Sequence, residues 1–180
     1  MNLVNPGLTR HDFPFVTDNL TKGSLMAIHR LNHAVLYVRD VARSVAFYRE
    51  ILGFEVVIEI DGAAFLRAGG STNDHDLGLF SVGTQAGPSE AGRSTVGLFH
   101  LAWEVETLRN LVELAQRLTD AIDHHVTKSL YGQDPDGLKF EIAWVVPSDQ
   151  LDEAALARPD DTPLDLDREI ARYGADTPGG

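Results

Sequence analysis

Cysteine is absent from the 180 residues of this chain. Disulfides, zinc–thiolate sites, iron–sulfur clusters and cysteine nucleophiles are therefore excluded. Any metal must be held by His, Asp or Glu side chains, which are ligands typical of iron, manganese, zinc or nickel.

Positive charge is also scarce, since 15 Lys and Arg residues stand against 27 Asp and Glu residues and the formal net charge is -12. Such a surface repels nucleic acid and anionic membranes, and no basic stripe interrupts it. No apolar run approaches the roughly 20 residues of a membrane span, and the N-terminus lacks the basic-then-apolar pattern of a secretory signal. The sequence therefore predicts a cytoplasmic protein with neither a nucleic-acid nor a membrane partner.

Hydrophobic residues make up 43% of the chain, which is enough for the core of one domain or of two small fused modules. The first residues show no sustained hydrophobic periodicity. The last residues are acidic and contain proline, and a short helix is predicted near the C-terminus. A segment rich in Gly, Ser, Thr and Pro interrupts the middle. The predicted parts are an N-terminal arm (1–27), a single domain (28–146) of two modules (28–83 and 97–146) joined by a linker (84–96), and a C-terminal tail (147–180).

Both modules show the same order of elements, a strand, a helix and then three strands. The first strand is predicted over residues 28–38, and Asp40 is the expected N-cap of the helix that follows it. Aligning His33 with His100 superimposes the two patterns with an offset of 67 residues. The sequence therefore predicts an α+β fold of two βαβββ modules.

Strand alternation selects the residues that share a face. Within GLFHLAWEV, the larger side chains Phe99, Leu101, Trp103 and Val105 are expected to pack under a helix, so that His100 faces the opposite way. Glu141 lies opposite its apolar neighbours on the last strand, and a buried carboxylate there needs a partner. A metal held by His33, His100 and Glu141 would provide one. Two histidines and a carboxylate leave other metal positions open, which suits Fe(II); Mn(II) accepts the same ligands.

The segment IDHHVTKSLYGQDPDGLKFE, residues 122–141, resembles the motif of extradiol ring-cleavage dioxygenases of the vicinal-oxygen-chelate superfamily. Eight constrained positions of that motif are filled by Ile122, His124, Leu130, Tyr131, Asp134, Pro135, Gly137 and Glu141. The stretches LNHAVLYVRDVARSVAFYREILGFEV, FLRAGGSTNDHDLGLF and LFHLAWEV are also similar to the family. The resemblance covers residues 29–146 and implies a vicinal-oxygen-chelate fold with curved mixed sheets around the metal.

The resemblance also implies roles for individual residues. His33, His100 and Glu141 would hold Fe(II), and His75 would handle protons near the oxygen site. His124 and Tyr131 would hydrogen-bond the catechol oxygens, although the adjacent His125 remains open as the catalytic histidine. The implied activity is cleavage of a catecholic ring beside its diol with O2, in the degradation of aromatic compounds. Catechol, alkylcatechols and 2,3-dihydroxybiphenyl all remain open as substrates, as does the ring bond that is cleaved.

Two other classes of function share this fold. One is a glyoxalase-like isomerase or a fosfomycin-type thiol transferase; glyoxalase-like sites usually add a fourth protein ligand from the last strand of the first module, where this chain offers His75 but no Glu. The other is a metal-free antibiotic-binding protein, against which the His33, His100 and Glu141 triad argues. The one-domain relatives suggest a homodimer or a higher homo-oligomer.

Overall fold

The structure, a computed structural model, describes residues 28–92, 94–118, 120–151, 157 and 160–180. The predicted N-terminal arm lies outside these residues, as does part of the predicted tail. Residue contacts divide the chain after Leu31, and the account below concerns the part from Asn32 onward. Within the described residues, no helix combines the length and the apolar character needed to cross a membrane.

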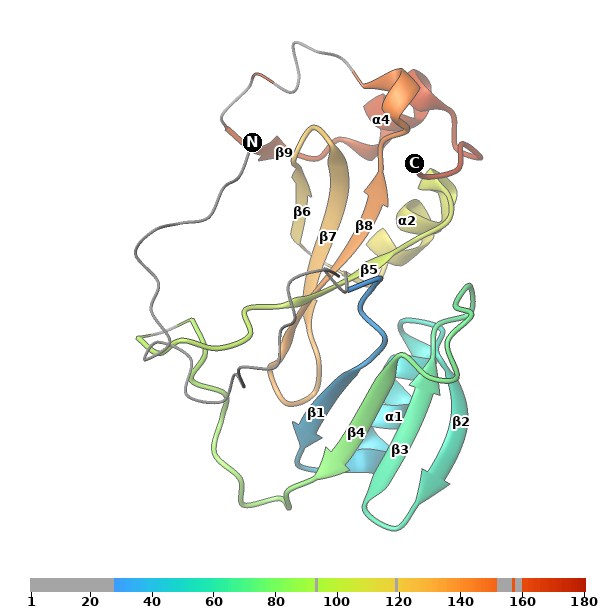
Figure 1. Ribbon diagram of the computed structural model, residues 1–180. Helices are drawn as coiled ribbons and strands as arrows, with labels where there is room; N and C mark the ends of the chain where they lie inside the picture. Colours follow the sequence, from blue (N-terminus) through green and yellow to red (C-terminus); the bar gives the residue numbers. More distant parts are fainter. Residues whose placement is uncertain (1–27, 93, 119, 152–156, 158–159) are drawn as a thin grey trace, which may run out of the picture. The chain divides into compact units, whose positions relative to one another are not determined.

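The first module is a four-stranded mixed sheet with one helix (Figure 1). Its elements are β1 (Ala34–Val38), α1 (Val41–Glu50), β2 (Glu55–Ile60), β3 (Ala63–Arg67) and β4 (Leu77–Ser81). The strand order is β1-β4-β3-β2, with β1 parallel to β4 and the other pairs antiparallel. Asp40 caps α1 as predicted, because its carboxylate accepts a hydrogen bond from Arg43 N. The β2–β3 hairpin turns at Gly62, whose φ of 74° favours a residue without a Cβ.

The second module repeats this topology in a second mixed sheet. Its elements are β5 (Leu101–Glu104), α2 (Leu108–Ala115), β6 (Asp120–Asp123), β7 (Thr127–Gln133) and β8 (Lys139–Val145). Here β5 is parallel to β8, and the remaining pairs are antiparallel. Ala34 and Leu101, which begin β1 and β5, are 67 residues apart, as are Val41 and Leu108, which begin α1 and α2. The predicted repeat of two βαβββ modules is therefore confirmed.

The C-terminal segment attaches to the second sheet and extends it. It contains a 3-10 turn (Ser148–Gln150), β9 (Thr162–Pro163) and α4 (Leu166–Tyr173). Strand β9 pairs antiparallel with β6, so the sheet order becomes β5-β8-β7-β6-β9. Leu166, Ile170 and Tyr173 of α4 pack against the core of the second module. The short helix predicted for the tail is therefore confirmed.

A buried charged cluster fastens α4 to the second sheet. Lys128 of β7 is only 1% exposed, donates a hydrogen bond to Asp123, and lies 3.3 Å from a carboxylate oxygen of Glu169. Arg168 donates to the same two carboxylates from the solvent side. Buried charges persist in proteins only when they are paired in this way.

Each module has its own hydrophobic core, and the two cores meet through aromatic side chains. The core of the first module lies between its sheet and α1, and that of the second packs α2 and α4 against β7 and β8. Phe54 meets Trp103 with 5.0 Å between ring centroids, and Phe47 meets Phe140 at 5.8 Å.

The strands that carry the predicted histidines are shorter than the sequence suggests. Strand β1 begins at Ala34 and β5 at Leu101, so His33 and His100 each stand one residue before a strand. Strand alternation therefore does not extend to Phe99, and the prediction that it packs under a helix is wrong, since it is 57% exposed.

Within DHHVTK, residues 123–128, a turn separates β6 from β7. His125 adopts a left-handed φ of 70° there, and this reverses the chain. The residues on either side then pair directly, Asp123 with Lys128. A single left-handed residue in a turn leaves no periodic signal in the sequence.

Candidate active site

A hollow of about 910 Å³ opens on the face of the second sheet that is turned away from its core. It is lined by side chains from β6 and β7 and by the residues that lead into β5. Phe99, Ala121 and Ile122 form apolar wall, while His100, His124 and Tyr131 contribute polar groups to the same space. The hollow therefore combines apolar wall with several hydrogen-bonding groups, as small-molecule sites usually do.

His100, which lines this hollow, lies beside Glu141. Parallel pairing of β5 with β8 places Ala102 beside Glu141, which brings the end of the preceding segment close to the carboxylate. His100 Nε2 lies 3.1 Å from Glu141 Oε2. Glu141 is buried while its neighbours Phe140 and Ile142 belong to the core, so the histidine is the partner that a buried carboxylate needs.

His124 and Tyr131 form a second pair in the same hollow. His124 lies in the turn that follows β6 and Tyr131 lies in β7, and His124 Nε2 is 2.7 Å from the Tyr131 hydroxyl oxygen. Tyr131 stands opposite Glu141 in the β7–β8 register. Burial and then the negative charge of Glu141 raise the pKa of Tyr131 to about 12. Its hydroxyl group therefore keeps its proton at neutral pH and acts as a hydrogen-bond donor.

The adjacent histidines have different surroundings. His125 is buried, its Nε2 lies 2.9 Å from the carbonyl oxygen of Asp160, and its backbone N–H donates to Asp123. His124 is the one that contacts Tyr131 and lines the hollow. The geometry thus favours His124 over His125 as the histidine that faces a ligand.

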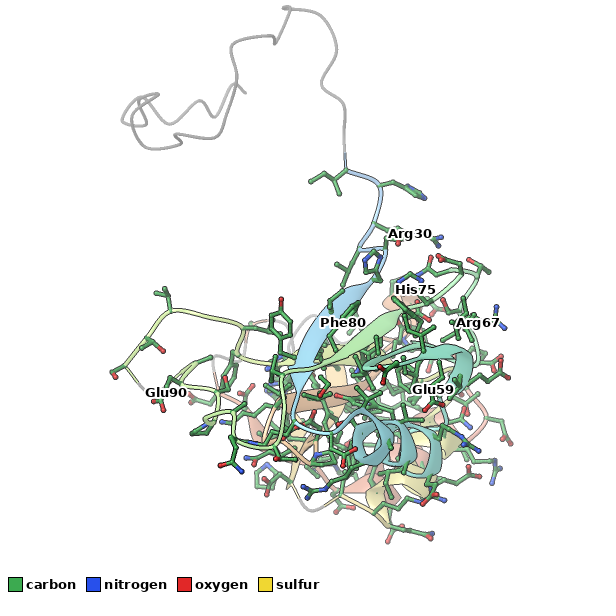
Figure 2. All side chains as sticks on the ribbon, turned by 90° about the horizontal axis from the view of Figure 1, so that it is seen from below. Arg30, Glu59, Arg67, His75, Phe80 and Glu90 are labelled. Carbon is green, nitrogen blue, oxygen red and sulfur yellow. The ribbon has the colours of Figure 1, made fainter. Side chains whose placement is uncertain are left out.

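The other two predicted histidines lie together at the first sheet. The rings of His33 and His75 are 4.6 Å apart, and His75 Nδ1 is 2.8 Å from Asp74 Oδ2. The ring of Phe65 contacts both His75 and Phe80. Figure 2 labels the latter two side chains. In the part of the chain that the structure describes, no group of three His, Asp or Glu side chains is close enough to hold a metal. The structure thus brings His100, Glu141, His124 and Tyr131 together and places His33 beside His75.

His100 and Glu141 together have the chemistry of part of a metal site. An imidazole nitrogen and a carboxylate oxygen are donors that Fe(II) and Mn(II) accept. His100 Nδ1 is buried and has no hydrogen-bond partner among the described residues, so the described protein atoms do not occupy both ring nitrogens. His100 and Glu141 therefore offer two donors that suit such a metal, while His33 as the third ligand stays a prediction of the sequence.

Asp161 is a site residue that the sequence analysis missed. Its Oδ1 lies 2.7 Å from His124 Nδ1, on the side of the ring opposite Tyr131. The two residues are 37 positions apart, and Asp161 lies in a tail whose many acidic residues make no one of them distinctive. The pairing of β9 with β6 creates this contact, and no local sequence pattern predicts it.

Comparisons with known proteins agree with this architecture. Residues 30–142 match the Glyoxalase/Bleomycin resistance protein/Dioxygenase superfamily. Biphenyl-2,3-diol 1,2-dioxygenase 3 of Rhodococcus globerulus is 33% identical over 120 residues, which are 63% of this chain and 62% of that protein. This chain therefore spans less than two thirds of that relative's length.

Two further proteins are matched over a larger share of their own length. Metallothiol transferase FosB of Staphylococcus saprophyticus is 27% identical over 136 residues, which are 69% of this chain and 83% of that protein. The glyoxylase/bleomycin resistance protein/dioxygenase domain from Frankia sp. EAN1pec has a TM-score of 0.55 at 21% identity, and covers 68% of this chain and 96% of its own. The fold is therefore glyoxalase-like, and the chain belongs to the Glyoxalase/Bleomycin resistance protein/Dioxygenase superfamily.

Proposed function

We propose that this chain is an extradiol dioxygenase, which cleaves a catecholic ring beside its vicinal diol with O2 at a mononuclear Fe(II). The observation that carries the proposal is the His124–Tyr131 pair, joined at 2.7 Å in a hollow that His100 also lines, with Glu141 lying 3.1 Å from His100. A diol bound in this hollow meets a nitrogen base and a hydroxyl donor beside the metal ligands. The Rhodococcus relative, whose name gives it this class of reaction, supports the same assignment.

His33, His100 and Glu141 are the proposed metal ligands. To bind a cation, the imidazoles must be neutral and the carboxylate ionised, and burial of Glu141 beside His100 suits a site that excludes water. An Fe(II) held by these residues would supply Lewis-acid and redox chemistry for a reaction between a diol and O2.

The residues of the chain have separate tasks in this reaction. His124 accepts a proton from a diol hydroxyl through Nε2, the nitrogen that faces the hollow and now contacts Tyr131. The Tyr131 hydroxyl, which remains protonated, donates a hydrogen bond to a diol oxygen and stabilises its negative charge. Phe99 and Ile122 give the aromatic ring an apolar surface and displace water from it.

The first module provides an argument against a glyoxalase-like fourth ligand. In the second module Glu141 pairs with Ala102, the second residue of β5, and the equivalent pair in the first module joins Val35 to Gly78. A Cβ added to Gly78 would lie 3.4 Å from both Val35 and Phe80, so apolar groups surround this position. A site without that ligand keeps more metal positions open, as binding of both a diol and O2 requires.

The test is anaerobic reconstitution with Fe(II), followed by 2,3-dihydroxybiphenyl or catechol in aerated buffer. We expect a yellow ring-opened product and uptake of one O2 for each diol. Glu141→Ala should abolish both together with metal binding, whereas Glu59→Ala, which removes an exposed carboxylate on β2, should not.

Absence of both colour and O2 uptake across a panel of diols, with metal demonstrably bound, would contradict the proposal. Isomerase or thiol-transferase chemistry on the same fold would then be the better assignment, the latter in line with the FosB relative. Failure of the chain to bind any divalent metal would instead favour a metal-free binding protein.

A further inference from the structure

The C-terminal segment reaches the hollow through one side chain, that of Asp161. It lies in a stretch beyond residue 142, where the family match ends. Asp161 directly precedes β9, whose Thr162 pairs with Asp123 at the end of β6. Because His124 is the next residue after Asp123, this pairing brings the Asp161 carboxylate to the outer side of the His124 ring.

The chemistry of this contact determines where His124 carries its hydrogen. An ionised carboxylate only accepts hydrogen bonds, so at 2.7 Å from Asp161 Oδ1 the Nδ1 of His124 must be protonated. In a neutral imidazole the other nitrogen then bears the lone pair. That nitrogen is Nε2, which faces Tyr131 and the hollow.

We propose that Asp161 is a positioning residue, which holds the His124 ring in place and fixes its Nδ1–H tautomer so that Nε2 is available as the base. Its role in catalysis depends on the proposed dioxygenase function, but the tautomer does not. The inference extends the active site into the C-terminal segment, which therefore contributes to the chemistry as well as to the sheet.

The anchoring of the segment distinguishes Asp161 from an ordinary surface acid. Its side chain is 60% exposed, and an exposed ion pair alone contributes little to stability. The backbone beside it is nevertheless fixed on both sides, by the carbonyl of Asp160 at His125 Nε2 and by the pairing of β9. The carboxylate thus approaches a ring that is itself three-quarters buried.

The first measurement is the tautomer of His124 by 15N NMR on the full-length, metal-free protein, at about pH 8.5, where an unperturbed imidazole is neutral. We expect wild type to show a protonated Nδ1 and an unprotonated Nε2. Asp161→Ala should shift His124 toward the Nε2–H form. Asp176→Ala is the matched control, because it removes another exposed tail carboxylate, the one that pairs with Arg109, and it should leave the His124 signals unchanged.

The second measurement separates kcat from KM in the Fe(II) enzyme with the best diol found. Asp161→Ala should lower kcat on the order of 10–100-fold, the range for loss of the outer partner of a site histidine, with KM changed far less. Asp176→Ala should retain wild-type values, and both variants should keep the wild-type Tm within a few degrees.

A wild-type His124 that carries its hydrogen on Nε2, or an Nδ1–H form that persists in Asp161→Ala, would overturn the inference. So would equal kcat for Asp161→Ala and Asp176→Ala. If the expected tautomer shift appears but no diol is cleaved, the proposed function fails and the positioning of His124 by Asp161 stands.

Discussion

The buried cation Lys128 allows the most direct test of how the buried charged cluster stabilises the fold. Its ammonium group lies between Asp123 and Glu169, which are 5% and 1% exposed. Lys128→Met preserves the length of the side chain but leaves two buried carboxylates whose remaining cationic partner among the described residues is Arg168, with a side chain that is 55% exposed. Removal of one partner of a buried ion pair typically costs about 3–5 kcal/mol.

Urea unfolding followed by tryptophan fluorescence should detect this loss. If the free energy of unfolding falls by about 2 kcal/mol per molar urea, the urea midpoint of unfolding should fall by about 1.5–2.5 M. Lys139→Met, which replaces an exposed lysine on β8, is the matched control and should change stability by less than about 0.5 kcal/mol. Glu169→Gln in the Lys128→Met background should restore part of the loss, because it removes one of the two unpaired charges.

The pH dependence of stability tests the same ion pair. Burial opposes ionisation of Asp123, but hydrogen bonds from Lys128 and from the backbone of His125 outweigh it, and its pKa lies below the ordinary 3.8. Ionised Asp123 therefore stabilises the fold above its ordinary pKa, and this contribution disappears as the pH falls through the folded value. The wild type should lose its advantage over Lys128→Met upon such acidification. A midpoint shift below about 0.5 M at neutral pH would refute the reasoning, since the two carboxylates would then not need this cation.

Three further predictions concern the site and its supports. Tyr131→Phe should retain metal but lower kcat about 10–100-fold, the equivalent of about 1.5–3 kcal/mol for a hydrogen bond to a charged group; an unchanged kcat would remove the hydroxyl from the mechanism. His33→Ala should weaken Fe(II) binding in anaerobic equilibrium dialysis, while His29→Ala should not, and equal affinities would exclude His33 as a ligand. Burial raises the pKa of Asp134 above 3.8, so its ionisation destabilises the fold progressively as the pH rises through the folded value. Asp134→Asn should therefore gain stability relative to wild type from pH 4 to pH 7 in urea titrations, and a gain that is independent of pH would contradict this assignment.

The sequence predicted the repeated architecture well because local signals encode it. Asp40 and Thr107 cap their helices through side-chain contacts three residues away, and patterns of this kind can be read along the chain. Glu141 was predicted to need a partner because its apolar neighbours imply burial, and the structure provides His100. The resemblance of residues 122–141 to the extradiol motif implies that His124 and Tyr131 contact one substrate, which stays a prediction, and the structure places the two side chains 2.7 Å apart.

The interactions that the sequence analysis did not find connect distant segments. Asp161 approaches His124 from 37 residues away, and the buried Lys128 contacts Glu169 of α4. Nothing in the immediate sequence of Lys128 marks it as a buried cation, since charged residues on strands are usually exposed. The position of His33 relative to His100 depends in turn on how two modules pack, and a periodic pattern within each module does not determine that arrangement.

Strand β9 also has a consequence for the solubility of the protein. Without it, β6 would be the outermost strand of its sheet and would present unpaired N–H and C=O groups, a template on which other chains can aggregate. Strand β9 covers this edge at Ile122 and Asp123 with only two residues, and one of them is Pro163, which has no N–H to donate. The sheet thus ends on a short strand that is poorly suited to accept another.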